Sequence, residues 1–204
     1  GRDFTTYTAE VVPWLWFLTQ TKDCRIFQTK SVPEIIEQVF KEMGFTAFET
    51  SEIKGTHVKW DYCVQYRETD FDFISRLAEH EVIFYWFRHE KGKHTMVLGD
   101  QKRAYKDLSE KELSFSANLS APDPTDLITS WEHTYEFRPG KWAQTDYNFE
   151  TPSASLLTKT KTVLQIDELD KFEIFDFPGE YEKQGDGESD IELRMEGEEA
   201  AHGG

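Results

Sequence analysis

Residues 66–100, YRETDFDFISRLAEHEVIFYWFRHEKGKHTMVLGD, decide the fold, because a helix start, an aromatic strand and a tight turn follow one another almost without a linker. Thr69 is placed to cap a helix with one apolar face. That face is formed by Phe73, Ile74, Leu77 and Ala78. The next residues predict a hairpin of strands 81–87 and 94–98 about a turn at Lys91-Gly92. The stretch is typical of a packed helix-plus-hairpin unit, and nothing in it resembles a catalytic loop.

A second helix start stands at residues 31–34. The Ser31 hydroxyl can accept from the backbone three residues on while Glu34 reaches back, and Pro33 sits in the first turn, where an amide is not needed. Apolar residues then recur at helical spacing up to Met43, and Gly44 is placed to end the helix in a left-handed conformation. The pattern predicts a helix over 32–43.

Short strand candidates surround these helices. Residues 11–18 form an apolar run broken only by Pro13, which predicts a strand buried on both faces. Residues 59–66 alternate aromatic and polar side chains and predict another strand. Beyond Asp107, alternating runs separated by turn residues predict a meander or barrel segment with strands at 113–115, 127–137 and 142–149. Near the end, residues 172–177 predict a strand, and Ser189 is placed to cap a last, acidic helix.

Charge and cysteine content exclude several classes of protein. The 204 residues carry a formal net charge of -16, which disfavours binding to nucleic acid. Residues 167–199 hold 14 acidic and three basic residues, so this end is either a solvated acidic surface or a docking surface for a basic partner. Cys24 and Cys63 lie outside any CxxC pairing, which favours a reducing compartment without disulfides. No apolar run reaches the length of a membrane span, and the start lacks signal-peptide features, so we expect any export to use another route.

Metal chemistry has one weak candidate. His89 and His94 flank the predicted turn and would lie on neighbouring strands, with His57, His80 or Cys63 as a conceivable third ligand. A structural zinc site needs four ligands and a catalytic one at least three. Two polar histidines beside an exposed turn are ordinary surface or packing residues. We therefore predict no metal site.

Acid–base chemistry has one candidate pair as well. Asp146 and Glu150 lie in TDYNFETP among aromatics that could line a sugar cleft. Four residues apart on a strand, they would be separated by about 13 Å, at ~3.3 Å per residue, too far for a glycosidase. The simpler interpretation is solvent-facing carboxylates alternating with buried Tyr147 and Phe149. Nucleophile elbow, zincin, Walker A and dinucleotide motifs are absent, so we predict no catalytic and no cofactor-binding residue.

Five segments in order carry a family resemblance. They are PWLWFLTQTKDCRIFQTKSVPEIIEQVF, YCVQYRETDFDFISRLAEHEVIFYWF, HTMVLGD, WAQTDYNFETP and FDFPGEY. Together they resemble the VgrG spike proteins of bacterial type VI secretion, in the part akin to the hub protein of contractile phage baseplates. The resemblance covers about Pro13 to Glu199.

The resemblance implies an α+β fold, a mixed alpha/beta domain with beta-barrel segments. By analogy, residues 1–20 end a first barrel, 21–106 form the first part of the mixed domain, 107–150 supply second-barrel strands, and 151–204 return to the mixed domain with the acidic C-terminal helix. The start of the first barrel and the family's neck and needle are missing, so we expect the chain to be a fragment.

The implied function is mechanical. VgrG-like proteins form homotrimers on a tube of Hcp rings and carry a PAAR-type tip and effectors. They assemble in the bacterial cytoplasm and leave through the type VI apparatus without a signal peptide or stable membrane insertion. The acidic residues 167–199 would then be an outer or docking face. A contractile phage tail hub, a cell-wall hydrolase that uses Asp146 or Glu150, and a carbohydrate- or protein-binding module stay open as alternatives.

Overall fold

The computed structural model of the protein describes residues 5–107, 112–115, 127–134 and 136–200. The chain divides into two compact units, residues 1–109 and 110–204. Parts of the predicted second-barrel region, residues 108–111, 116–126 and 135, lie outside the described residues. Helices and sheets are mixed in the chain, which confirms the α+β class. The sheets of the described residues are open and have two or three strands, so the barrel segments stay a prediction.

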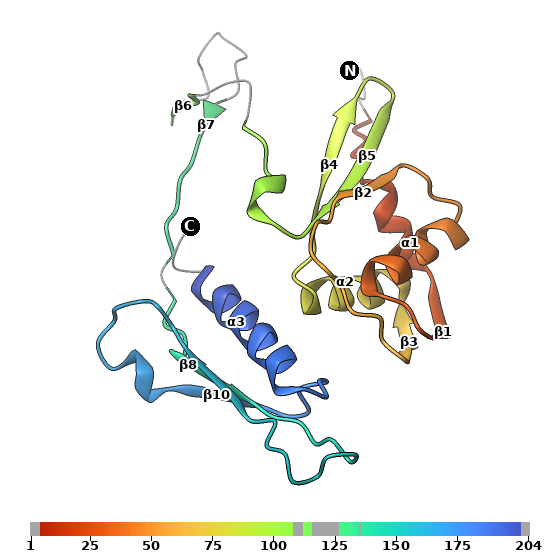
Figure 1. The fold of residues 1–204 in the computed structure, drawn as a ribbon. Coiled ribbons are helices and arrows are strands. Elements are labelled where there is room, and N and C mark those ends of the chain that lie inside the picture. The colour runs from red at the N-terminus through yellow and green to blue at the C-terminus, as the bar shows by residue number, and fades with distance from the viewer. Residues whose placement is uncertain (1–4, 108–111, 116–126, 135, 201–204) are drawn as a thin grey trace. The chain divides into compact units, whose positions relative to one another are not determined.

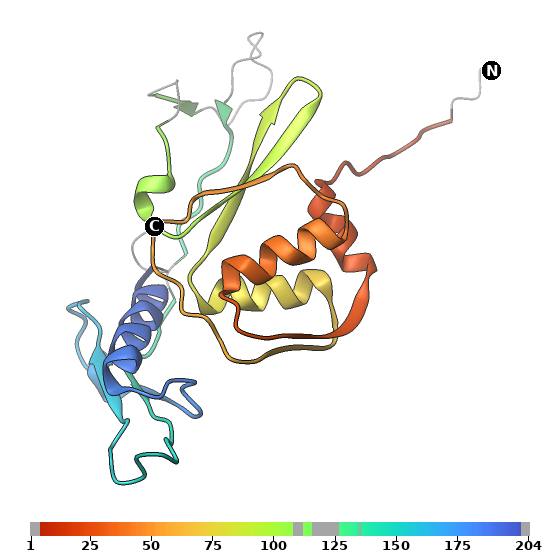
Figure 2. The same cartoon turned by 45° about the vertical axis from the view of Figure 1, so that its right-hand side comes forward.

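In the first unit, two helices and a 3-10 helix pack together with two small sheets (Figures 1 and 2). Strands β1 (Lys22–Phe27) and β3 (Cys63–Thr69) form an antiparallel ribbon. In the other sheet, of order β2-β5-β4, β2 (Phe48–Glu52) runs parallel to β5 (Lys93–Gly99), and β4 (Phe84–Glu90) is antiparallel to β5.

Both predicted helices of this unit are confirmed. Helix α1 (Val32–Glu42) begins at the predicted capping box, in which the Ser31 amide donates to Glu34 Oε2 at 2.9 Å. Gly44 follows it at φ 79°. Helix α2 (Asp70–His80) begins at Thr69, whose hydroxyl oxygen accepts from the Asp72 amide at 3.0 Å. Local capping chemistry therefore set both helix starts.

The predicted hairpin is also confirmed, with small shifts of its ends. Strands β4 and β5 pair from Phe84 opposite Gly99 to Glu90 opposite Lys93. The connection is Lys91-Gly92, and Gly92 has the positive φ of 76° that this turn requires. The strand predicted over 59–66 is observed as β3 at Cys63–Thr69, so it begins and ends later than the alternation indicated.

The strand predicted over 11–18 is wrong. Residues Trp14–Gln20 form a 3-10 helix, η1, which begins after Pro13. Burial is one-sided, because Trp14, Leu15 and Leu18 are buried, whereas the rings between them are exposed. A strand buried on both faces would hide all of these side chains, but a helical segment needs to bury only one face. The Trp14 ring stacks on Phe45 at 4.6 Å between ring centroids.

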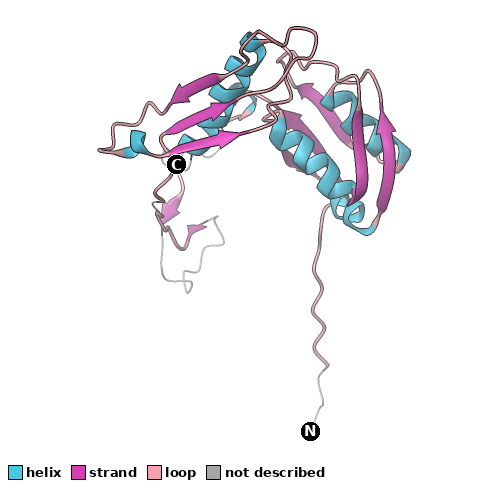
Figure 3. Ribbon diagram, turned by 90° about the horizontal axis from the view of Figure 1, so that it is seen from below, coloured by secondary structure: helices cyan, strands magenta, loops and turns pink. Residues whose placement is uncertain are grey.

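The second unit contains a three-stranded sheet with one long helix on it (Figures 1 and 3). Its strand order is β10-β8-β9, with β8 (Lys141–Gln144) at the centre, parallel to β10 (Glu173–Asp176) and antiparallel to β9 (Thr158–Lys161). Strands β6 (Ser114–Phe115) and β7 (Leu127–Ile128) pair separately. Two further short 3-10 helices, η2 (Lys102–Ala104) and η3 (Leu169–Lys171), lie one in each unit.

Sequence patterns were less accurate in this unit. The strand over 172–177 is confirmed as β10, but those over 127–137 and 142–149 shrink to β7 and β8. The acidic helix exists as α3 (Gln184–Ala200), yet it begins before Ser189, so Ser189 is not its cap. Gly185 and Gly187 disfavour a helix in the sequence pattern, so the pattern does not indicate this earlier start. At Gly187 the Tyr181 ring occupies the space that a Cβ would need, 2.3 Å away. Gly187 therefore serves packing rather than helix termination.

Candidate functional site

Within the first unit, the histidines and Cys63 that were candidate metal ligands do not gather at one site. His89 and His94 are register partners across the β4–β5 hairpin, with ring centroids 6.1 Å apart. His94 Nε2 accepts a hydrogen bond from the Trp14 amide at 3.2 Å, which ties η1 to β5. His80 packs edge-on against Trp60. Among the described residues, no group of three or more histidines, cysteines and carboxylates gathers as metal ligands.

Asp146 and Glu150 follow β8 in a loop instead of lying on the predicted strand. Asp146 accepts the amide of Tyr147 through Oδ1 and the amide of Glu180 through Oδ2, both at 2.6 Å. Both oxygens of this carboxylate therefore accept hydrogen bonds from backbone amides. Tyr147 and Phe149 are exposed, so the expectation that they are buried is wrong. The loop can present their rings to solvent because it is not constrained by the alternation of a strand.

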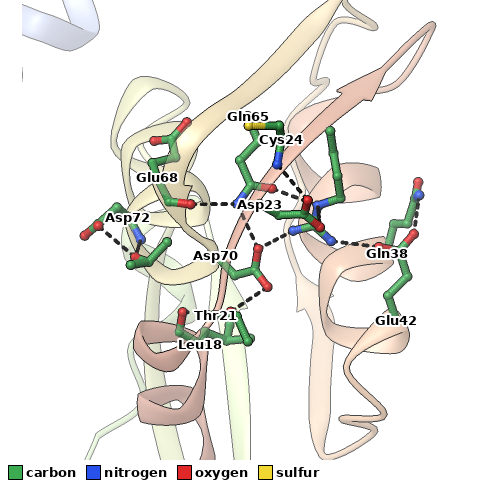
Figure 4. Close-up of polar contacts among 12 residues, drawn as sticks. Leu18, Thr21, Asp23, Cys24, Gln38, Glu42, Gln65, Glu68, Asp70 and Asp72 are labelled. Carbon is green, nitrogen blue, oxygen red and sulfur yellow. Dashed lines mark hydrogen bonds and ion pairs between the residues drawn. The ribbon is translucent and has the colours of Figure 1, made fainter.

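A buried polar network centred on Asp70 joins the ribbon to helix α2 (Figure 4). The Asp70 side chain accepts from Thr21 Oγ1 and from Gln65 Nε2, each at 2.8 Å, and forms an ion pair with Arg25. Arg25 Nε in turn donates to Gln65 Oε1 at 2.8 Å, which closes a ring of three side chains. Asp70 is 2% exposed and Gln65 0%. Arg25 also reaches Glu42 at the end of α1, at 2.8 Å.

The network fixes the geometry of the unit. Its members come from β1, β3, the segment before β1 and the ends of both helices. A buried carboxylate is tolerated only when it is paired and hydrogen-bonded. Its three donors satisfy Asp70, so the carboxylate holds these elements together and is not free to act as a base.

A second, half-buried cluster holds His57 in place. Its Nδ1 lies 2.6 Å from Glu81 Oε2 and its Nε2 lies 3.2 Å from Asp100 Oδ2. Asp100 also accepts the amides of Lys54 and Gly55. The hydrogen bond to Glu81, aided by Asp100, raises the pKa of His57 above 6.5 against the opposing effect of burial. Both ring nitrogens are engaged, so this histidine fastens the β2–β3 connection to the ends of α2 and β5.

Sequence reasoning missed these two clusters. The sequence patterns indicate His57 only as a conceivable metal ligand, and they do not predict the Asp70 network. One signal was present: β3 places Gln65 on the same inward face as buried Cys63, where a polar residue needs a partner. The partners themselves lie 40 and 5 residues away along the chain.

One exposed face of the first unit carries a group of apolar side chains. On the outer face of the β1–β3 ribbon, Ile26 is opposite Val64 and Cys24 is opposite Tyr66. These four side chains, the ribbon face, are all exposed, Ile26 at 59% and Tyr66 at 64%. Apolar side chains grouped on one exposed face are typical of protein contact sites.

Comparison with known proteins identifies the family of this chain. The profile of the family described as "Phage tail baseplate hub (GPD)" matches residues 1–203. The chain belongs to the phage tail baseplate hub family. Within this hub family, the chain is similar to the type VI secretion system spike protein VgrG1a of Pseudomonas aeruginosa, with 42% identity over 98% of the chain and 31% of the relative. The spike protein VgrG1c of the same organism is 40% identical over 95% of the chain and 26% of that relative.

A solved structure also matches this hub-family chain. It is the E. coli c3393 protein, described as a type VI secretion component with structural similarity to the T4 phage tail proteins gp27 and gp5. The match has a TM-score of 0.45 and 24% identity, and covers 47% of this chain and 27% of that chain. The chain spans about a third of the length of VgrG1a and about a quarter of VgrG1c. None of the described helices is long and apolar enough to cross a membrane.

Proposed function

We propose that this chain is the hub part of a type VI secretion puncturing spike. In this role three copies assemble and dock on the Hcp tube, and the chain itself performs no catalysis. The observation that carries the proposal is 42% identity to a named spike protein over 98% of the chain. Two further relatives, matched over 95% and 98% of the chain, are also named as type VI secretion spike proteins.

The internal contacts support a rigid mechanical part. The buried carboxylates of the first unit, Asp70 and Asp100, are bound by donors from several elements. Such networks lock one arrangement of helices and strands, and their partners leave no oxygen free for acid–base chemistry. The exposed apolar side chains of the ribbon face supply a surface for assembly, where many modest contacts are sufficient.

The remaining parts of the proposal concern the full-length protein. A PAAR-type tip and effectors would be carried through regions outside this chain. Assembly would take place in the bacterial cytoplasm, followed by secretion through the type VI apparatus. Within the chain, we propose that residues 1–20 and 107–150 contribute to barrels and that 21–106 and 151–204 belong to the mixed domain.

A contractile phage tail hub is the second candidate, favoured by the description of the family that matches the whole chain. Both functions need an assembled hub on a tube. They differ in the tube that the hub accepts. Binding of the full-length protein to a tail tube protein but not to Hcp would favour the phage function.

A secretion assay tests the proposal. In a strain that depends on the full-length protein, the paired change Ile26→Asp and Val64→Asp would place two charges on the ribbon face, and we expect the release of Hcp into the medium to stop. The change Val58→Asp, at a side chain that is 67% exposed and lies outside the ribbon face and the proposed barrel segments, is the matched control and should leave release intact. Normal release from the paired variant would contradict a role for the ribbon face. Normal release after deletion of the whole gene would contradict the spike function.

A further inference from the structure

The three-stranded sheet of the second unit has two chemically different faces. Helix α3 covers one face, where Gln144 Nε2 donates to Asp190 at 3.0 Å and Arg194 lies over the Trp142 ring. Successive residues of a strand point to opposite faces. The opposite face therefore carries the alternate residues of all three strands, which are Lys141, Ala143, Lys159, Lys161, Glu173 and Phe175.

Three lysines on this opposite face are unexpected in a chain with a net charge of -16. Lys141 and Lys161 are direct register partners, and like charges directly opposite destabilise a sheet. Lys141 has Asp170 at 3.9 Å. Within the described part of the chain, Lys159 and Lys161 form no ion pair with another residue. The unit thus compensates Lys141 through Asp170 and through its other register partner, Glu173, but among the described residues it leaves Lys159 and Lys161 without an ion pair.

An apolar side chain lies among these charges. Phe175 shares a register row with Ala143 and Lys159, and it is 61% exposed. The same side of the sheet is hollowed by a depression of about 440 Å³. Its lining residues are Lys141, Lys159, Thr160, Lys161 and Glu173. We call the three lysines and Phe175 the lysine face. It combines a cationic rim with an exposed ring, which fits an anionic surface that carries an apolar side chain.

The outer side of helix α3 is an anionic surface that carries an apolar side chain. Gly187, Ile191 and Met195 recur every four residues and are buried. The other side of the helix exposes carboxylates, with Leu193 among them at 42% exposure. These carboxylates, which we call the acid stripe, belong to Asp186, Glu188, Glu192 and Glu196.

We propose that the lysine face of one copy docks on the acid stripe of a second copy of this chain. The inference rests on the proposed function, which requires several copies in one spike. The acid stripe presents Leu193 among carboxylates, and the lysine face presents Phe175 among three lysines and Glu173, so the two surfaces carry opposite net charge. The surfaces lie on opposite sides of the same sheet, so the contact is head-to-tail. A head-to-tail contact closes into a ring when the rotation between copies permits it.

The contact would depend on salt. Lys159, Lys161, Glu192 and Glu196 are exposed, and exposed charge pairs weaken beyond a Debye length of about 8 Å at physiological ionic strength. Their main contribution is to orientation and register, whereas burial of Phe175 against the helix supplies apolar contact.

Zero-length carbodiimide cross-linking of the full-length protein tests the contact. The protein is prepared as a mixture of ¹⁴N- and ¹⁵N-labelled copies, so that mass spectrometry separates links between copies from links within one. We expect isotopically mixed links that join Lys159 or Lys161 to Glu192 or Glu196. Raising the salt concentration to about 1 M, where the Debye length is about 3 Å, should reduce their yield several-fold.

Charge reversal sharpens the test. Lys159→Glu with Lys161→Glu should abolish detectable association through this contact, and adding Glu192→Lys with Glu196→Lys in the same chain should restore it. For these variants the readout is the particle mass in light scattering, measured at low and at raised salt concentration. Lys91→Glu with Lys93→Glu changes the same charge at two exposed lysines of the first unit, also two residues apart, and is the matched control.

The possible results distinguish a failure of the docking inference from a failure of the proposed spike function. If the protein assembles and binds the tube but yields no mixed links at these residues, the docking inference is overturned and the spike function stands. If the four-residue swap assembles no better than the two-lysine variant, the inference is overturned as well. A full-length protein that stays a single copy would overturn both.

Discussion

Replacing Asp70 by alanine is expected to cost much of the stability of the first unit. The carboxylate is 2% exposed and receives three donors, one of them the charged Arg25. Hydrogen bonds to charged groups contribute about 1.5–3 kcal/mol each. The donors retain partial alternatives, since Arg25 keeps Glu42 and Gln65 keeps the Glu68 carbonyl. We therefore expect a loss of about 3–5 kcal/mol, the range for breaking a buried pair.

Urea unfolding of the chain measures this loss. With a slope of about 2 kcal/mol per molar urea, the midpoint should fall by about 1.5–2.5 M. Asp70→Asn keeps the size of the side chain but turns an amide nitrogen toward donors, so it should lose most of the same stability.

Asp72→Ala is the matched control, because Asp72 lies two residues along the same helix and is exposed. Its side chain accepts from Thr69 Oγ1 and lies near the positive end of the helix, so its loss should cost about 1 kcal/mol or less. The reasoning is refuted if Asp70→Ala costs no more than Asp72→Ala.

Three further predictions concern other parts of the chain. The carboxylates around His57 raise its pKa above 6.5 in the folded chain. The stabilisation is therefore complete below pH about 6.5 and is lost as the pH rises through the folded-state pKa, so the free energy of unfolding should fall over that interval. His57→Gln should remove this fall. Gly187→Ala should destabilise by about 1–3 kcal/mol, because the new methyl group would lie 2.3 Å from an aromatic ring. Gly197→Ala, in the same helix with nothing within 4 Å, should stabilise by about 1 kcal/mol. With an aromatic disulfide reagent the folded chain should react at exposed Cys24 and should expose buried Cys63 only on unfolding.

Each of these predictions has an opposing result. If the free energy of unfolding of His57→Gln depends on pH as in the unchanged chain, the contacts of His57 with Glu81 and Asp100 contribute nothing to folding. Equal effects of the two glycine changes would contradict the packing account of Gly187. Rapid reaction of two thiols would contradict the burial of Cys63.

Structure set by neighbouring residues was predictable. The capping box at Ser31, the N-cap at Thr69 and the turn at Gly92 act over a few residues, and the structure has them where the patterns placed them. The incorrect predictions, those for residues 11–18 and for the start of α3, also have a common physical cause. In residues 11–18 and at Gly187, tertiary packing decided between two locally acceptable conformations, and periodicity over a short apolar run does not distinguish them.

The polar clusters were beyond local patterns. Arg25 and Asp70 are separated by 45 residues, and His57 and Asp100 by 43, so their meeting depends on how the ribbon and the helices pack. Strand β9 was missed because its sequence, TKTK, has no apolar alternation. Its lysines face away from the helix that its threonines contact, and only the sheet register shows this.

The mass of the full-length protein in solution tests the central claim most directly. Light scattering should find three copies in one particle, and addition of Hcp should shift that particle to a larger mass. A single copy that does not change mass in the presence of Hcp would contradict the assignment of this chain to the hub of a type VI secretion spike.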